Sequence, residues 1–215
     1  MSPGNKSTTT RDRLLKVAER LFAQKGYDSV SVREITNAAH CNLAAVNYHF
    51  GNKKALYQQM FRERWMSRAQ RILACFEENL AARDETSFPS VIQSLAEAFI
   101  KGPLTDEERL CHFQLMTREL IKPSDAFEMV ATETMRPFFE KLGQRLKPFL
   151  SDTVDEERML LNIISIIALV IYFNFARVPV SKIIDHVYDE PFKDRLVQHI
   201  VQFSLFGIPL REDTR

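Results

Sequence analysis

Residues 53–83 of this chain contain neither glycine nor proline, the two residues that most often interrupt a helix. Apolar residues recur throughout this stretch: Leu56, Met60, Trp65, Ile72, Leu73, Phe76 and Leu80. This pattern predicts one long helix. The whole chain has only 6 glycines and 9 prolines in 215 residues, too few turn formers for the many short strands of a sandwich or barrel. Glycine is also too scarce for a dinucleotide-binding fold, so an all-α chain is predicted.

Shorter helices are predicted on both sides of the long one. Periodicity, caps and prolines indicate helices that end near residues 25 and 39, and helices at about 43–50, 89–101, 105–121, 124–149, 155–176 and 190–206. Pro137 falls inside the segment 124–149, where it should either kink the helix or begin its second half. Pro179 is assigned to a link between the last two helices.

Charge is distributed unevenly along the chain. Residues 1–65 hold 11 Lys or Arg and five Asp or Glu, a net charge of +6, whereas residues 66–215 hold 18 bases and 23 acids, a net charge of −5. A polyanionic partner would therefore meet the N-terminal part of the chain. A solvated basic face with no partner is the alternative interpretation of the same pattern.

The cysteines and the missing motifs exclude several classes of protein. Cys41, Cys75 and Cys111 are odd in number and form no CxxC pair, so neither a disulfide framework nor a zinc site is predicted. GxSxG, HExxH and glycine-rich phosphate-loop motifs are absent from the sequence, so we expect no cofactor, no metal and no enzymatic activity. The N-terminal residues lack the apolar core of a signal peptide, which together with the unpaired cysteines predicts a cytoplasmic protein.

Residues 159–176 form an apolar stretch of 18 residues, at the lower edge of what a membrane-spanning helix needs. The stretch contains Asn162, Ser165 and Asn174. These polar residues favour a helix buried in a core or against a partner subunit, and no membrane association is expected.

Two short helices joined by a tight turn, inside the basic part of the chain, are typical of a helix-turn-helix. Ser31 is predicted to cap the first helix, with Glu34 completing a capping box, and Asn42 is predicted to cap the second. The residues predicted to pack the pair are Ile35, Ala38, Ala39, Val46 and Phe50, and those predicted to face outward are Leu43, Ala44, Asn47, Tyr48 and His49. Amide, small apolar and aromatic groups of this kind can contact base edges and phosphates in the major groove.

The run Thr10–Leu56 resembles the N-terminal domain of the TetR family of bacterial transcriptional regulators. The matching residues are LF at 21–22, GY at 26–27, SVREI at 31–35 and NLAAVNYHFGNKKAL at 42–56. The resemblance implies that the partner is double-stranded operator DNA. By position it implies a base or phosphate contact from Arg33, base reading by Leu43, Ala44 and Asn47, and backbone contacts from Ala45, Tyr48, His49 and Lys53. The predicted DNA-binding set also includes Asn42, at the start of the second helix.

Two positions depart from the family's pattern. His40 stands in the turn where many relatives have glycine, so a strained backbone with positive φ is expected there. Asn47 stands where the family often has tyrosine, so the operator of another member does not transfer to this chain.

The resemblance also implies that the remainder is a helical domain that dimerises through its last two long helices and encloses a small-molecule pocket. The predicted domains are residues 1–52, the helix-turn-helix domain, and residues 53–215, the effector-binding and dimerisation domain. The sequences MLLNIISIIALVIYF and LVQHIVQFSLF carry more apolar residues than one core face needs, which agrees with an interface between two chains. Candidate effector-binding residues are Phe76, Phe99, His112, Met116 and Asn162.

These observations predict a ligand-responsive homodimeric repressor that binds a palindromic operator and is released by a small, largely apolar or aromatic effector. Two alternatives stay open on the sequence alone. One is a constitutive DNA-binding regulator whose C-terminal half serves only for dimerisation. The other is an enzyme, such as a hydrolase with His112 or His186 as its base.

Overall fold

The computed structural model describes residues 9–208 and 210, which form two compact units. The first unit holds the chain up to Ala69 together with Thr105–Thr134, and the second holds Gln70–Leu104 together with the chain from Met135 onward. The described residues contain helices and one isolated antiparallel bridge, and no strand. This division differs from the boundary predicted after residue 52, because the first unit extends beyond it; as a division of function, that boundary stays a prediction.

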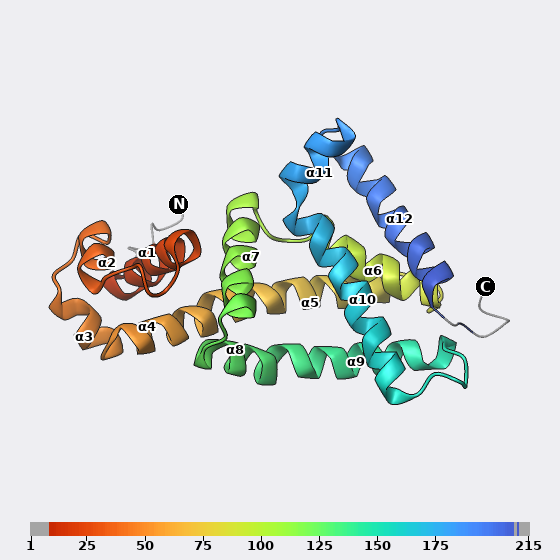
Figure 1. Ribbon diagram of the computed structural model, residues 1–215, viewed down its shortest axis with the longest axis horizontal. Coiled ribbons are helices and arrows are strands. Elements are labelled where there is room, and N and C mark those ends of the chain that lie inside the picture. The colour runs from red at the N-terminus through yellow and green to blue at the C-terminus, as the bar shows by residue number, and fades with distance from the viewer. Residues whose placement is uncertain (1–8, 209, 211–215) are drawn as a thin grey trace, which may run out of the picture. The chain divides into compact units, whose positions relative to one another are not determined.

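The first unit is built from short helices and two π-helical turns (Figure 1). Its elements are α1 (Thr10–Lys25), α2 (Val32–Ala38), α3 (Ala44–Phe50), α4 (Lys53–Met60), the π turn η1 (Phe61–Trp65), the start of α5 (Met66–Ala81), α7 (Asp106–Ile121), α8 (Asp125–Val130) and the π turn η2 (Ala131–Met135). A capping box between Thr9 and Asp12 begins α1, and Gly26, with φ +83°, ends it, as predicted for a residue without a Cβ.

The long helix predicted over 53–83 is confirmed as one unbroken helical run, but it has a π turn inside it. The segments α4, η1 and α5 follow one another without a gap from Lys53 to Ala81. Because a π turn holds an extra residue, it rotates the side chains that follow relative to those before it.

The core of the first unit lies around α1. Leu14, Ala18 and Phe22 of α1 are fully buried, and the ring of Phe22 meets that of Tyr57 edge to face with a centroid distance of 4.9 Å. Charged groups are buried here as well: the carboxylate of Glu19, only 3% exposed, binds the guanidinium of the buried Arg68 and that of Arg64. The pairs tie α1 to the long helical run.

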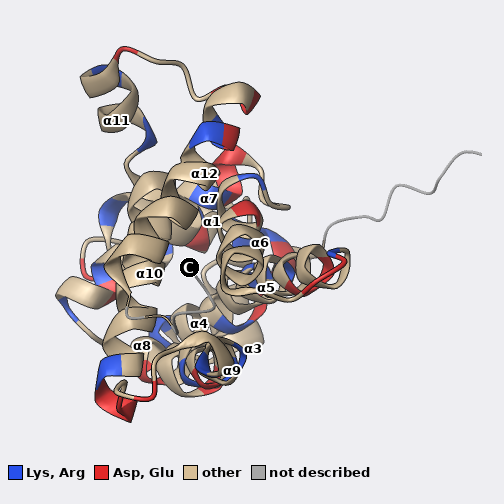
Figure 2. Cartoon of the chain, turned by 90° about the vertical axis from the view of Figure 1, so that its right-hand side faces the viewer, with Lys and Arg blue, Asp and Glu red and all other residues tan. Residues whose placement is uncertain are grey.

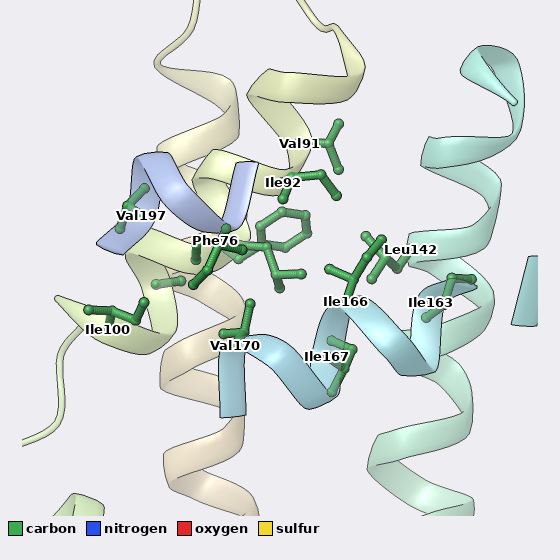
Figure 3. Close-up of a cluster of buried hydrophobic side chains, with 14 of the residues drawn as sticks. Phe76, Val91, Ile92, Ile100, Leu142, Ile163, Ile166, Ile167, Val170 and Val197 are labelled. Carbon is green, nitrogen blue, oxygen red and sulfur yellow. The ribbon is translucent and has the colours of Figure 1, made fainter. Parts of the chain in front are cut away.

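The second unit consists of helices around one apolar core. Its elements are the remainder of α5, then α6 (Phe88–Ile100), α9 (Arg136–Leu146), the 3-10 turn η3 (Lys147–Phe149), α10 (Glu156–Phe175), α11 (Arg177–Ile184) and α12 (Glu190–Gly207). In Figure 3 the side chains of Ile163, Ile166 and Val170 from α10 point toward Phe76 of α5 and Leu142 of α9. All five of these residues are buried, so α10 contributes one face to this core.

The helix α10 is long and apolar enough to cross a membrane by length and composition, and among the described residues it is the one helix for which this holds. It was predicted to be buried on nearly all sides. Within this single chain, however, Leu161, Ile164 and Tyr172 of α10 are exposed, while Asn174 is buried and donates a hydrogen bond to the carbonyl of Phe99 at 2.8 Å.

Two of the predictions for prolines have different outcomes. Pro137 lies in the first turn of α9, so it begins the second half of the segment 124–149, which the structure divides into α8, η2, α9 and η3. The link assigned to Pro179 is wrong, because this residue lies in α11. A proline is tolerated there since the first four N–H groups of a helix have no partner within the helix.

Candidate nucleic-acid interface

The helix pair α2–α3 begins with a serine cap. The Oγ of Ser31 accepts a hydrogen bond from the backbone N–H of Glu34 at 3.1 Å, as predicted. The reciprocal half of the predicted capping box does not form, because the Glu34 carboxylate binds the Nζ of Lys25 at 2.6 Å instead. This ion pair fastens the start of α2 to the end of α1, and it lowers the pKa of Glu34.

The turn between α2 and α3 carries the strain expected at His40, which has φ +51°. The N–H of Cys41 closes the turn on the carbonyl of Thr36 at 3.0 Å. The Oδ1 of Asn42 accepts from the N–H of Ala45 at 3.0 Å, so the predicted capping role of Asn42 is confirmed, although the helix itself begins at Ala44. This bond occupies the amide oxygen, while the Asn42 side chain stays exposed.

The outer face of α3 presents most of the side chains predicted to read DNA. Leu43 and Tyr48 are 51% and 84% exposed, and Ala44 and Asn47 are exposed as well. His49 differs from the prediction, since it is half-buried, and its ring meets that of Tyr48 edge to face. Ala45 is also half-buried.

The inner face of the pair is formed by fewer residues than predicted. Ile35, Ala39 and Val46 are buried, and Phe50 is half-buried. Ala38 was expected to pack there but is exposed. The place is taken by Ala39, which lies one helical turn after the buried Ile35 and donates its N–H to the Ile35 carbonyl at 2.9 Å.

The two basic residues of the predicted DNA-binding set differ in environment. Arg33 is exposed on α2. Lys53, at the start of α4, is half-buried, and its Nζ lies 4.2 Å from the ring centroid of Tyr27, a cation–π contact. Desolvation lowers the pKa of Lys53. To reach a phosphate, this ammonium must leave the ring of Tyr27. The contact between Lys53 and Tyr27 joins residues far apart in the chain, so no local sequence pattern indicates it.

A pocket of about 230 Å³ lies within the first unit, between the α1–α2 turn, α4 and the end of α7. Its lining includes Tyr27, Lys54, Tyr57, Glu119 and Lys122, and none of the five candidate effector-binding residues belongs to it. The buried carboxylate of Glu119 accepts hydrogen bonds from the hydroxyl of Tyr57 at 2.6 Å and from Ser124.

The candidate effector-binding residues are divided between the two units. His112 and Met116 lie on α7 in the first unit, whereas Phe76, Phe99 and Asn162 lie in the second. Phe76 is fully buried in the core, Phe99 packs against that core, and Asn162 is half-buried with no hydrogen-bond partner for its Nδ2. A single site containing all five stays a prediction.

His112 is held as a neutral ring. It stacks on Trp65 at a centroid distance of 4.2 Å, and the Nε1–H of Trp65 donates to the backbone carbonyl of His112 at 2.9 Å. The Nδ1 of His112 has no hydrogen-bond partner. Burial, together with the nearby positive charge of Arg68, lowers the pKa of His112 from 6.5 to about 3.

Two family models match the chain. Residues 14–60 match the bacterial regulatory proteins of the tetR family. Residues 90–208, more than half of the chain, match the C-terminal domain of the HTH-type transcriptional dual regulator CecR. The first match covers α1 to α4, which include the helix pair described above, and the second covers most of α6 to α12.

Individual proteins give the same result. The HTH-type transcriptional repressor AcnR of Corynebacterium glutamicum is 35% identical over 63 residues, which cover 29% of this chain and only 34% of AcnR. Among solved structures, the fatty acid degradation regulator FadR of Bacillus halodurans aligns over 96% of this chain and 100% of its own, with a TM-score of 0.63 and 18% identity. A transcriptional regulator of Saccharomonospora viridis in complex with choline aligns over 94% and 98%, with a TM-score of 0.62 and 17% identity. At these identities the structural matches show a shared fold.

The environment of His112 predicts acid sensitivity. Its pKa is lower in the folded chain than in the unfolded one, so the unfolded state binds a proton first and stability is lost as the pH falls from 6.5 toward 3. Between pH 7 and pH 5 this residue should lower the free energy of unfolding by about 2 kcal/mol. His112→Phe keeps an aromatic ring that cannot titrate. Urea denaturation at pH 7 and pH 5 should therefore show that the free energy of unfolding falls by about 2 kcal/mol less in this variant than in the wild type. Parallel pH profiles would contradict the neutral buried ring.

Proposed function

Because the chain belongs to the TetR family of bacterial regulatory proteins, with a C-terminal domain of the CecR type, we propose that it is a ligand-responsive homodimeric repressor of transcription. It binds a palindromic operator in the cytoplasm and leaves it when a small, largely apolar or aromatic effector binds. Proteins of this family are DNA-binding transcriptional regulators and not enzymes. The observation that carries the proposal is the exposed face of α3, which has the side chains that base reading needs.

The role in repression rests on the N-terminal part of the chain. AcnR, which is similar there, is named a repressor. In this chain the α2–α3 pair lies within residues 1–65, which carry a net charge of +6. The pair presents an amide, a leucine and a tyrosine to the solvent. A helix with these groups can lie in the major groove with these side chains directed toward the base edges.

Dimerisation is supported by an apolar surface on the second unit. Leu161 and Ile164 of α10 are 55% and 44% exposed, and Phe203 and Phe206 of α12 are 61% and 89% exposed. Figure 2 shows α10 without a charged residue along most of its length. Monomeric proteins rarely expose so many large apolar side chains on two neighbouring helices, which favours a partner subunit at this surface.

An effector is supported by the chemistry of the second unit and by the solved relatives. The half-buried amide of Asn162 has an Nδ2 without a partner, beside an apolar core that includes Phe76. A donor in such surroundings suits a mostly apolar ligand that carries an acceptor. The Saccharomonospora viridis regulator was solved with choline, so a protein of this fold takes a small molecule.

Base reading by Asn47 should be separable from phosphate binding by Lys53. Asn47→Ala removes a side chain that can pair with a base edge, so it should cost about 1 to 3 kcal/mol at one operator position and relax the preference there. Lys53→Ala should weaken binding to all DNA by a similar factor. Both affinities can be measured on operator variants by fluorescence anisotropy. A change of base preference in Lys53→Ala would reverse these assignments.

The apolar surface of α10 and α12 should form the dimer interface. Phe203→Arg places a charge on that surface in both subunits, so dimerisation and operator binding should be lost together. Sedimentation measures the dimer, and circular dichroism checks that helix content is retained. Lys193→Ala, a change elsewhere on α12, is the control. An unchanged dimer in folded Phe203→Arg would move the interface to another surface.

The effector should be coupled to DNA. A ligand that lowers operator affinity must itself be bound more weakly by the same factor when operator DNA is present. Apolar metabolites, antibiotics and aromatic acids can be screened for thermal stabilisation, and each hit titrated by calorimetry with and without operator DNA. Hits whose affinity is equal in both titrations would favour the constitutive regulator, whose C-terminal half serves only for dimerisation.

A further inference from the structure

The helix α3 is held to the rest of its unit by few contacts. It has seven residues, and Val46 is the one buried residue among them. Its first turn is capped from outside the helix, by the Oδ1 of Asn42 on the N–H of Ala45, and it ends at Gly51, whose φ of +83° permits the chain to change direction. A single buried side chain does not fix the direction of a short helix. Contacts at the ends of α3 must therefore contribute to its orientation.

Arg11 of α1 makes such a contact at the C-terminal end. Its guanidinium carbon lies 5.4 Å from the ring centroid of Phe50, the last residue of α3. Both side chains are half-buried. A guanidinium over an aromatic face combines electrostatic attraction with flat packing, so it restricts where the ring can move.

The guanidinium of Arg11 is itself oriented by Glu63. Its Nη1 donates to the Oε2 of Glu63 at 2.7 Å, and its Nη2 donates to the Oε1, a two-pronged geometry that fixes the plane of the guanidinium. The amide of Gln59 in turn donates to Glu63 at 2.5 Å. This pairing raises the pKa of Arg11 and lowers that of Glu63, so both stay charged at neutral pH.

The π turn η1 places Glu63 on the side of α1. Glu63 and Arg64 are consecutive residues of η1, and they bind Arg11 and Glu19, two residues of α1 that lie two turns apart. A shift of one helix along the other would separate both pairs of opposite charges. The pairs thus define one alignment of α1 with the long helical run.

We propose that Arg11 is a positioning residue for DNA reading: held by Glu63, it fixes Phe50 and thereby the direction of α3. The inference rests on the proposed reading of bases by α3. It adds that sequence discrimination depends on an ion pair whose members touch no base. Movement of α4 and η1 reaches α3 through the same three residues, Glu63, Arg11 and Phe50.

Glu63→Gln distinguishes this role from a direct phosphate contact by Arg11. The substitution removes a negative charge from a protein that binds a polyanion, and it releases Arg11. If Arg11 acted on phosphate, DNA would therefore be bound equally well or more tightly. If Arg11 positions α3, operator affinity falls although the protein has become more basic.

The measurement uses a duplex selected by the wild-type chain from random DNA and a scrambled duplex of the same length. Glu63→Gln should lower the ratio of the two affinities about tenfold, the sum of a lost ion pair and a lost cation–π contact. Glu133→Gln is a matched control, because Glu133 pairs in the same two-pronged way with Arg62 of the same π turn. That variant should leave the ratio unchanged.

A charge-swapped variant and a double-mutant cycle separate positioning from stability. In Arg11→Glu with Glu63→Arg the ion pair is restored, but no guanidinium extends from α1 over Phe50; thermal stability should recover while the affinity ratio stays low. Arg11→Ala and Phe50→Leu should lower the ratio by less together than the sum of their separate effects, because they act through one contact.

The outcomes are distinct. An unchanged or increased ratio in folded Glu63→Gln would overturn the inference, as would full recovery of the ratio in the charge-swapped variant. A wild-type chain that selects no DNA sequence would overturn the proposed function, and this inference with it. Selection by the wild type with additive effects of Arg11→Ala and Phe50→Leu would overturn the inference alone.

Discussion

The first unit depends on the ion pairs that the buried carboxylate of Glu19 makes with Arg64 and Arg68. A charge that is only 3% exposed is costly unless it is paired, and here two guanidiniums, from Arg64 and Arg68, pair with it. The requirement for both partners fixes how α1 lies on the long helical run. Because α1 also packs against α2, α3 and α7, the position of α3 follows from that alignment.

The second unit is organised by apolar burial instead. Its core consists of buried apolar side chains from α5, α6, α9, α10 and α12, and Figure 3 shows part of this cluster. The same helices α10 and α12 keep apolar side chains on their outer faces. The apolar residues of these two helices therefore belong to two faces. One face is buried within the single chain, and the other is exposed and available to a partner subunit.

Local patterns in the sequence predicted much of this fold because local chemistry determines it. The caps at Ser31 and Asn42, the positive φ at His40 and the helix start at Pro137 each depend on a few adjacent residues. The contacts that could not be predicted join residues far apart in the chain: Lys53 with Tyr27, and Arg11 with Glu63. The π turn that carries Glu63 was not predicted, and α11 was missed because proline in a first turn resembles proline in a link.

The exposure of the Arg11–Glu63 pair bears on what it can do. Its side chains are 34% and 32% exposed, so water screens the charges and the pair contributes little to global stability compared with the buried Glu19 group. A helix with one buried residue needs only a small energy to change its direction, however, and a weak but well-oriented contact is sufficient to bias it. Stability and recognition thus depend on different ion pairs of the same helix α1. A change in either can alter one property without abolishing the other.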